Sequence, residues 1–156
     1  MDVINHISKP EDLPDAPITK PNSKHQPATS LYCNGPHIHE YLHEMRLQVL
    51  DQYPDVMTVG EAPSTPELVD VRKYVEPSRH ELCMLFQFDL FCIDMGPGGK
   101  FTPSAWQLKD LKSTIAKWQK SLSFSSGAWQ VCTNNYTDTS LLAAESGTDD
   151  CIRRCF

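Results

Sequence analysis

Asp2 and Glu61 are carboxylates that each stand at the end of an apolar, strand-like stretch. Val3–Ile7 reads as the end of one strand, and residues 56–61 read as a short buried strand that closes with Glu61. In a barrel of parallel strands, such positions face the mouth where active sites lie. Paired carboxylates there can cleave glycosidic bonds, one as nucleophile and one as proton donor. A carboxylate beside a strand is also commonly a cap or a surface group, so spacing alone leaves both interpretations open.

His39, Glu40 and His43 form a second constellation, His-Glu-x-x-His, on a predicted helix. Two histidines one turn apart can bind zinc in a metallopeptidase, with the glutamate as general base, and Glu61 could supply a third ligand. A helical wheel places both histidines off the apolar stripe, toward solvent, which favours a chance match. Three further histidines lack ligand spacing and are expected at the surface: His25, His37 and His80. We therefore predict no metal and keep a zinc peptidase as the less favoured alternative.

The composition is that of one globular domain. A length of 156 residues and a hydrophobic share of 40% allow a single core. The net charge of −6 and the scattered Lys and Arg argue against binding to nucleic-acid phosphates. No apolar run of about 18 residues predicts a membrane helix. The first residues lack a secretory leader pattern, so we expect a cytoplasmic protein.

The six cysteines are expected to be free thiols. Two of them, Cys83 and Cys92, lie inside apolar, strand-like sequence, as buried thiols of cytosolic proteins do. No Cys-x-x-Cys pair is present, so a redox motif or a zinc knuckle is not indicated.

Three helices are predicted after a proline-rich loop over residues 10–30. The first begins at Gly35-Pro36, the second at a capping box over residues 64–67, and the third near Ser104 and Gln107. Apolar stripes at spacings of three or four support the first and third helices. The stripes are Ile38, Leu42, Met45 and Val49, then Leu108, Leu111, Ile115, Trp118 and Leu122.

Strands alternate with these helices, which predicts β/α units around a parallel sheet. Besides residues 3–7 and 56–61, strands are expected within 82–94 and over 129–133. In the third strand every second residue is apolar: Met84, Phe86, Phe88 and Leu90. The sequence Gly-Pro-Gly-Gly that follows is expected to end this strand. The fold class is therefore α/β, about half of a (β/α)8 barrel, which typically needs about 250 residues.

Several segments resemble family 13 of the glycoside hydrolases, the α-amylase superfamily, in the order that the family has them. Met1–Lys9 (MDVINHISK) is similar to the second conserved block, and residues 57–61 (MTVGE) are similar to the third. Other segments resemble the oligo-1,6-glucosidase and fungal maltase (α-glucosidase) branch: Asn34–Leu42 (NGPHIHEYL), Gly96–Lys100 (GPGGK) and the helix at 108–118. The resemblance covers residues 1 to about 130 and implies a partial TIM barrel from about strand 4 to strand 7.

By this resemblance Asp2 is the nucleophile and Glu61 is the acid/base of a retaining mechanism. The implied reaction removes terminal α-linked glucose from short oligosaccharides such as maltose or isomaltose, without a cofactor. Asp2 would have to stay ionised, while Glu61 would need a raised pKa. Val3 follows the nucleophile, and valine at this place resembles the enzymes that accept α-1,6 links. It could equally be an ordinary β-branched strand residue, so its role in specificity stays open.

The chain also departs from the family's pattern. The arginine that the family has two residues before the nucleophile has no counterpart, and the first block is absent. After Trp129 the fourth block, an Asn-His-Asp run, is replaced by Thr-Asn-Asn-Tyr-Thr-Asp, in which Asp138 is at most a displaced remnant. We therefore expect residues 1–133 to be a partial catalytic barrel and residues 134–156 an unassigned tail. Such a chain would be inactive alone, and a non-catalytic remnant of the barrel is the main alternative.

The tail is predicted to result from a shifted reading frame or a misplaced splice, because residues 137–150 have neither helical nor strand period. Reading the transcript in both other frames after codon 129 should restore an Asn-His-Asp-like run. If neither frame restores it, the tail is an ordinary C-terminus of this protein.

Overall fold

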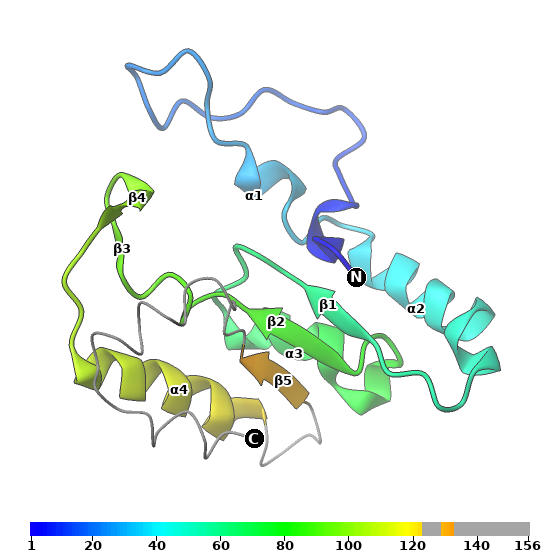
Figure 1. The fold of residues 1–156 in the computed structure, drawn as a ribbon. Coiled ribbons are helices and arrows are strands. Elements are labelled where there is room, and N and C mark those ends of the chain that lie inside the picture. The colour runs from blue at the N-terminus through cyan, green and yellow to red at the C-terminus, as the bar shows by residue number, and fades with distance from the viewer. Residues whose placement is uncertain (123–128, 133–156) are drawn as a thin grey trace.

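The computed structural model describes residues 1–122 and 129–132 of the chain (Figure 1). Its helices are α1 (Thr29–Tyr32), α2 (Ile38–Gln48), α3 (Leu68–Val75) and α4 (Leu108–Leu122). Its strands are β1 (Val59–Glu61), β2 (Met84–Gln87), β3 (Met95–Gly96), β4 (Gly99–Pro103) and β5 (Trp129–Cys132). Short 3-10 helices are η1 (Ile4–His6), η2 (Leu50–Gln52) and η3 (Pro77–Arg79).

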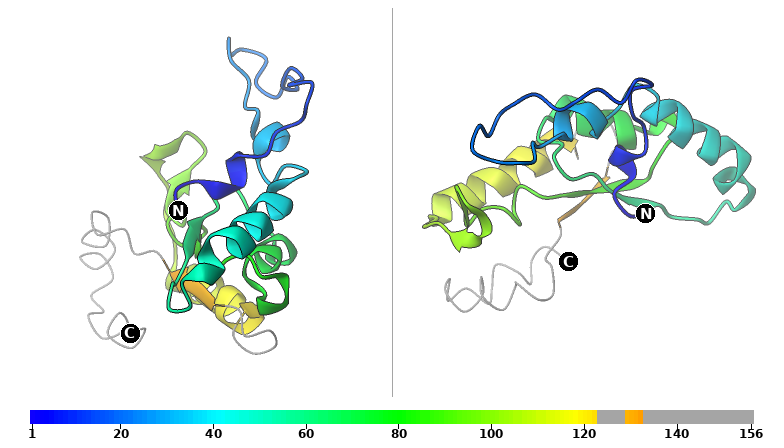
Figure 2. Two further views of the ribbon diagram at one scale, coloured as in Figure 1. Left: turned by 90° about the vertical axis from the view of Figure 1, so that its right-hand side faces the viewer. Right: turned by 90° about the horizontal axis from the view of Figure 1, so that it is seen from above.

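The central sheet is parallel, with the strand order β1-β2-β5. Glu61 at the end of β1 lies opposite Phe86 of β2, so the carboxyl ends of these strands share one edge. Helix α3 packs on β2 and α4 packs on β5, and the views of Figure 2 show the helices gathered on one face of the sheet. The predicted alternation of strands and helices around a parallel sheet is confirmed.

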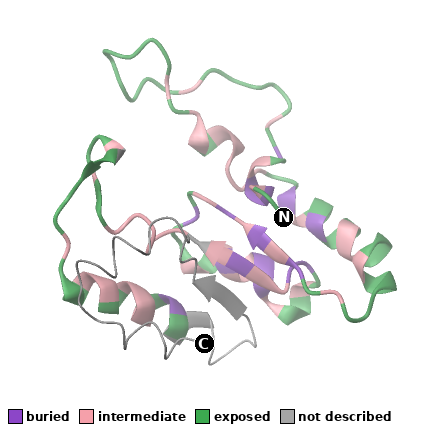
Figure 3. Ribbon diagram, viewed as in Figure 1, coloured by how far each residue is buried: buried purple, intermediate pink, exposed green. Residues whose placement is uncertain are grey.

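The hydrophobic core lies between the sheet and the helices (Figure 3). Its least exposed large side chains come from α2, α3, β2 and α4: Trp118, Tyr74, Ile38, Leu42 and Leu85. The predicted stripes of the first and third helices are therefore correct at their centres. Each stripe fails at one end, because α2 stops at Gln48 and leaves Val49 51% exposed, and Leu108 at the start of α4 is 48% exposed.

Strand β2 is shorter than the sequence predicts. It covers four residues, and the chain then turns, with the Cys92 N–H donating to the Phe88 carbonyl at 3.0 Å. Leu85, on the parity opposite to the predicted apolar set, is the residue buried at 1% exposure. Both faces of a parallel strand carry apolar residues, so parity could not identify the side that faces the helices. The Gly-Pro-Gly-Gly sequence forms the turn between β3 and β4, where Gly99 has a φ of 86°.

The strand predicted over residues 3–7 is not present. Within residues 1–7, only Met1 pairs with β1: its ammonium donates to the Val59 carbonyl at 2.8 Å, and its carbonyl accepts the Glu61 N–H at 2.9 Å. The chain then turns at Val3 into η1. Burial of the polar Asn5 draws the chain inward, away from the strand direction.

The predicted capping box is also wrong. Helix α3 begins at Leu68, after Glu67, and has no side-chain cap. Ser64, the cap of the predicted box, has a left-handed φ of 58°, and the next residue, Thr65, is buried and bonded elsewhere. Its hydroxyl donates to Asn34 Oδ1 at 3.2 Å and accepts from Asn5 Nδ2 at 3.1 Å. These bonds hold Thr65 outside the helix, so the box over residues 64–67 does not form.

Asn5, Asn34, Thr65 and Tyr74 form a polar cluster, here called the asparagine cluster, that joins four segments of the chain. The Tyr74 hydroxyl donates to Asn34 Oδ1 at 2.7 Å, and the Asn34 N–H donates to the Asn5 carbonyl at 2.8 Å. Asn34 has a φ of 53°, a conformation that asparagine tolerates better than most residues. The cluster thereby fixes the first residues against α3 and the loop after β1.

Replacing Tyr74 with phenylalanine should lower the free energy of unfolding by about 1–2 kcal/mol, because the hydroxyl is removed and Asn34 Oδ1 loses this donor. Urea unfolding followed by circular dichroism measures the change. Tyr41→Phe is the matched control: Tyr41 is 45% exposed on α2, and its change should stay within about 0.5 kcal/mol. Equal losses in the two variants would show that the buried hydroxyl contributes nothing specific.

Candidate active site

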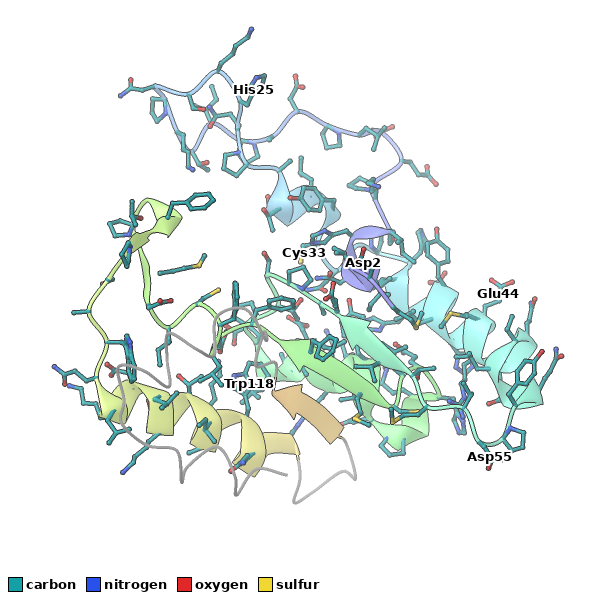
Figure 4. All side chains as sticks on the ribbon, in the orientation of Figure 1. Asp2, His25, Cys33, Glu44, Asp55 and Trp118 are labelled. Atoms are coloured by element: carbon teal, nitrogen blue, oxygen red, sulfur yellow. The ribbon has the colours of Figure 1, made fainter. Side chains whose placement is uncertain are left out.

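The structure brings the carboxyl groups of Asp2 and Glu61 together. Glu61 ends β1, and Asp2 follows Met1, whose main chain bonds to β1. The Glu61 carboxyl lies within hydrogen-bonding reach of both the Asp2 carboxyl and the Val3 N–H. Asp2 is exposed and Glu61 is half-buried, so the pair is open to solvent on one side. Figure 4 shows Asp2 above β1 in this view.

The pair favours a proton on Glu61. The pKa of Glu61 is raised, first by the hydrogen bond with the Asp2 carboxyl, then by burial and by the negative charge of Asp2. The Val3 N–H and the N-terminal ammonium oppose this rise, because both stabilise the ionised form. The arrangement can therefore offer one proton donor and one carboxylate in the same place.

Val3, the predicted specificity residue, lies beside the pair. It is half-buried and has left-handed backbone angles, with φ 40° and ψ 47°. This conformation is uncommon for a β-branched side chain. Val3 is therefore not an ordinary strand residue, and its part in linkage specificity stays a prediction.

The histidines of the His-Glu-x-x-His pattern have structural partners. His39 Nδ1 lies 2.7 Å from Glu81 Oε2, and its ring packs 4.7 Å from that of Tyr74. His43 Nδ1 lies 3.0 Å from the Arg79 carbonyl. The prediction that both rings face solvent holds for His43 and is wrong for His39, which the buried Glu81 draws inward. Three other histidines are exposed as predicted: His25, His37 and His80.

No three His, Cys, Asp or Glu side chains gather as a metal site within residues 1–122 and 129–132. In the same part of the chain, no helix is long and apolar enough to cross a membrane. The thiols of Cys33, Cys83 and Cys92 are free and half-buried.

Asp89 was missed by the sequence analysis. It follows β2, and its Oδ2 accepts from Lys117 Nζ at 2.8 Å and from Trp118 Nε1 at 3.0 Å. Lys117 Nζ also donates to the Pro66 carbonyl at 3.1 Å. These bonds tie α4 to the carboxyl ends of β1 and β2. The sequence could have indicated Asp89, because this carboxylate comes just after an apolar strand, as Glu61 comes at the end of β1.

A small apolar hollow of about 130 Å³ lies under the proline-rich loop. Its wall includes Pro10, Leu13 and Tyr32, with Lys9 as its charged residue. The Tyr32 ring packs edge-on against the His6 ring at 4.8 Å, so the hollow borders the segment that carries Asp2.

The sequence pattern of the protein family described as "Alpha amylase, catalytic domain" matches residues 1–154. The chain belongs to this family. It is 48% identical over 124 residues to an oligo-1,6-glucosidase of Parageobacillus thermoglucosidasius, which covers 78% of this chain and 21% of that protein. An α-glucosidase of Schizosaccharomyces pombe is 41% identical over 130 residues, covering 83% and 22% respectively.

Solved structures of sugar-converting enzymes are also similar to this chain. The trehalose-6-phosphate hydrolase of Bacillus licheniformis has a TM-score of 0.69 and 33% identity over 85% of this chain and 22% of that one. The isomaltulose synthase of Klebsiella sp. LX3 has a TM-score of 0.68 and 28% identity over 83% and 22%. The predicted resemblance to family 13 is confirmed, and the fold is part of that family's TIM barrel.

The chain spans 21% to 22% of the length of these two curated relatives. The match to the family pattern continues past residue 133 to residue 154. The division into residues 1–133 and 134–156, and the origin of the tail, stay predictions. Residues 133–156, including Asp138, lie outside the described part of the chain.

The contact with Asp2 should make stability depend on pH. A folded-state pKa of Glu61 above its ordinary value of 4.5 gives stability that is present below about pH 4.5 and is lost as the pH rises through the folded pKa. The Asp2→Asn variant removes the main cause of the rise and should lose less stability between pH 4.5 and pH 7. Urea unfolding at both pH values measures this. Asp55→Asn, at an exposed loop position, should keep the pH dependence of the parent chain. The same pH dependence in the Asp2 variant would show that the carboxyl groups do not interact.

Proposed function

We propose that this chain carries the nucleophile and the acid/base of a retaining α-glucosidase-type hydrolase, as strands 4 to 7 of the family's barrel. The contact between the Asp2 and Glu61 carboxyl groups carries the proposal. It occurs at the carboxyl ends of parallel strands, where barrels of this kind hold their active sites. Membership of the α-amylase catalytic-domain family and relatives named as glucosidases support it further.

The two carboxyl groups divide the reaction between them. Glu61, with its raised pKa, gives a proton to the leaving oxygen while the Asp2 carboxylate attacks the anomeric carbon and forms a glucosyl ester. Glu61, now ionised, takes a proton from water, and this water releases glucose with retained configuration. Each step uses only carboxyl groups and water, so the mechanism needs no cofactor.

The proposed substrate is a short oligosaccharide with a terminal α-linked glucose, of the maltose or isomaltose type. The names oligo-1,6-glucosidase and α-glucosidase among the relatives support this class. Val3 directly after the nucleophile favours acceptance of α-1,6 links. The cytoplasmic location stays a prediction.

The 156-residue chain is expected to be inactive alone. The matched segment is 21% of the length of the Parageobacillus relative, and hydrolysis needs further sugar-binding groups held in place around the two carboxyls. A non-catalytic remnant of the barrel is the alternative. The zinc peptidase is less favoured, because contacts with Glu81 and Arg79 account for His39 and His43 without a metal.

A chimera tests the function. Residues 1–122 of this chain would replace the matched segment of the Parageobacillus oligo-1,6-glucosidase, and hydrolysis of a nitrophenyl α-glucoside would be measured. We expect turnover in the chimera and a loss of about 10²–10⁴-fold or more in its Glu61→Gln variant. The Glu40→Gln variant is the control and should keep full turnover. If the chain carried a zinc peptidase site and no glucosidase site, the chimera itself would show no turnover of the glucoside.

A folded chimera whose turnover is unchanged by Glu61→Gln would remove Glu61 from the mechanism. The isolated chain should show no turnover. If it does hydrolyse the glucoside and Glu61→Gln abolishes this, the site is supported and the expected inactivity is wrong.

A further inference from the structure

We infer that Val3 is a positioning residue: its left-handed backbone turns the chain so that the Asp2 carboxyl and the Val3 N–H both meet the Glu61 carboxyl. The inference deepens the proposed function, on which its catalytic meaning rests. It concerns the main chain of Val3 and is independent of any effect of its side chain on linkage preference.

The chain is fixed on both sides of Val3. Before it, Met1 makes two main-chain bonds to β1, at 2.8 Å and 2.9 Å. After it, the Asn5 carbonyl accepts the Asn34 N–H at 2.8 Å, and Asn5 Nδ2 donates to the Pro63 carbonyl at 2.7 Å. Only three residues connect the two anchors, so the chain must leave the strand direction sharply between them.

Val3 makes this turn with φ 40° and ψ 47°. A β-branched residue keeps such angles only where its surroundings hold it there, and residues with strained backbone angles are common at functional sites. Here the bonds of Met1 and Asn5 hold the backbone of Val3. The Val3 carbonyl accepts the His6 N–H at 3.2 Å and so begins η1. The Val3 N–H stabilises the ionised form of the Glu61 carboxyl and so lowers its pKa.

Groups with opposite effects on the pKa act on the Glu61 carboxyl. The Asp2 carboxyl raises the pKa of Glu61, and the Val3 N–H and the Met1 ammonium lower it. An acid/base must give a proton in one step and take one in the next, so a pKa near the working pH serves it best. The Val3 N–H limits the rise that Asp2 and burial would otherwise cause.

Titration of Glu61 in the whole 156-residue chain tests the inference. The midpoint is read from the Glu61 carboxyl carbon by NMR. Val3→Gly keeps the N–H and accepts a positive φ, so its midpoint should match that of the parent chain. Val3→Pro lacks the N–H and cannot adopt a positive φ, so its midpoint should rise by about half a pH unit or more. A shifted midpoint in Val3→Gly would overturn the inference.

An ester in place of the amide between Asp2 and Val3 gives the decisive comparison, because Val3→Pro could also disturb the fold. The ester replaces the N–H with an oxygen atom and leaves the valine side chain in place. We expect the same upward shift of the Glu61 midpoint with an unchanged circular dichroism spectrum. An unchanged midpoint in the ester chain would overturn the inference. Neither outcome depends on turnover, so a failure here is separate from a failure of the chimera.

Discussion

The hydrogen bonds of Asn34 are the constraint on which the rest of the structure depends. Its side-chain oxygen accepts from Tyr74 of α3 and from Thr65, and its N–H donates to the carbonyl of Asn5. These groups are largely shielded from water, where an unpaired polar group is costly and satisfied networks are strong. The four segments they join are therefore held in one arrangement. Without it the first residues would have no fixed place beside β1.

The carboxyl pair is a consequence of that arrangement. The chain is held at Asn5 and paired with β1 at Met1. Asp2 therefore lies over the end of β1, beside Glu61. The contact raises the pKa of Glu61, which is the asymmetry that acid/base chemistry requires. Apolar packing, with Trp118 as its largest fully buried side chain, supports the sheet beneath the pair. Polar bonds set the position of the site, and the apolar core gives it a rigid base.

The sequence predicted what periodicity and strand order determine. Helix α4 and the buried Trp118 follow from a clear apolar stripe, and the meeting of Asp2 with Glu61 follows from the parallel strands and the family's motif order. Periodicity could not predict contacts between residues far apart in the chain. Residues 64–67 read as a helix start, because the bonds of Thr65 to two distant asparagines cannot be seen in the sequence. Val3 reads as a strand residue, because a positive φ in a β-branched residue is set by its anchors and not by its own preference.

Covalent trapping tests the central claim most directly. A fluorinated glucosyl fluoride forms the glucosyl ester of a retaining enzyme and then hydrolyses slowly, so the labelled peptide can be identified by mass spectrometry. In the active chimera, the account predicts one glucosyl group on the peptide that contains Asp2, and none after Asp2→Asn. A label on another carboxylate of the folded, active chimera would contradict the account.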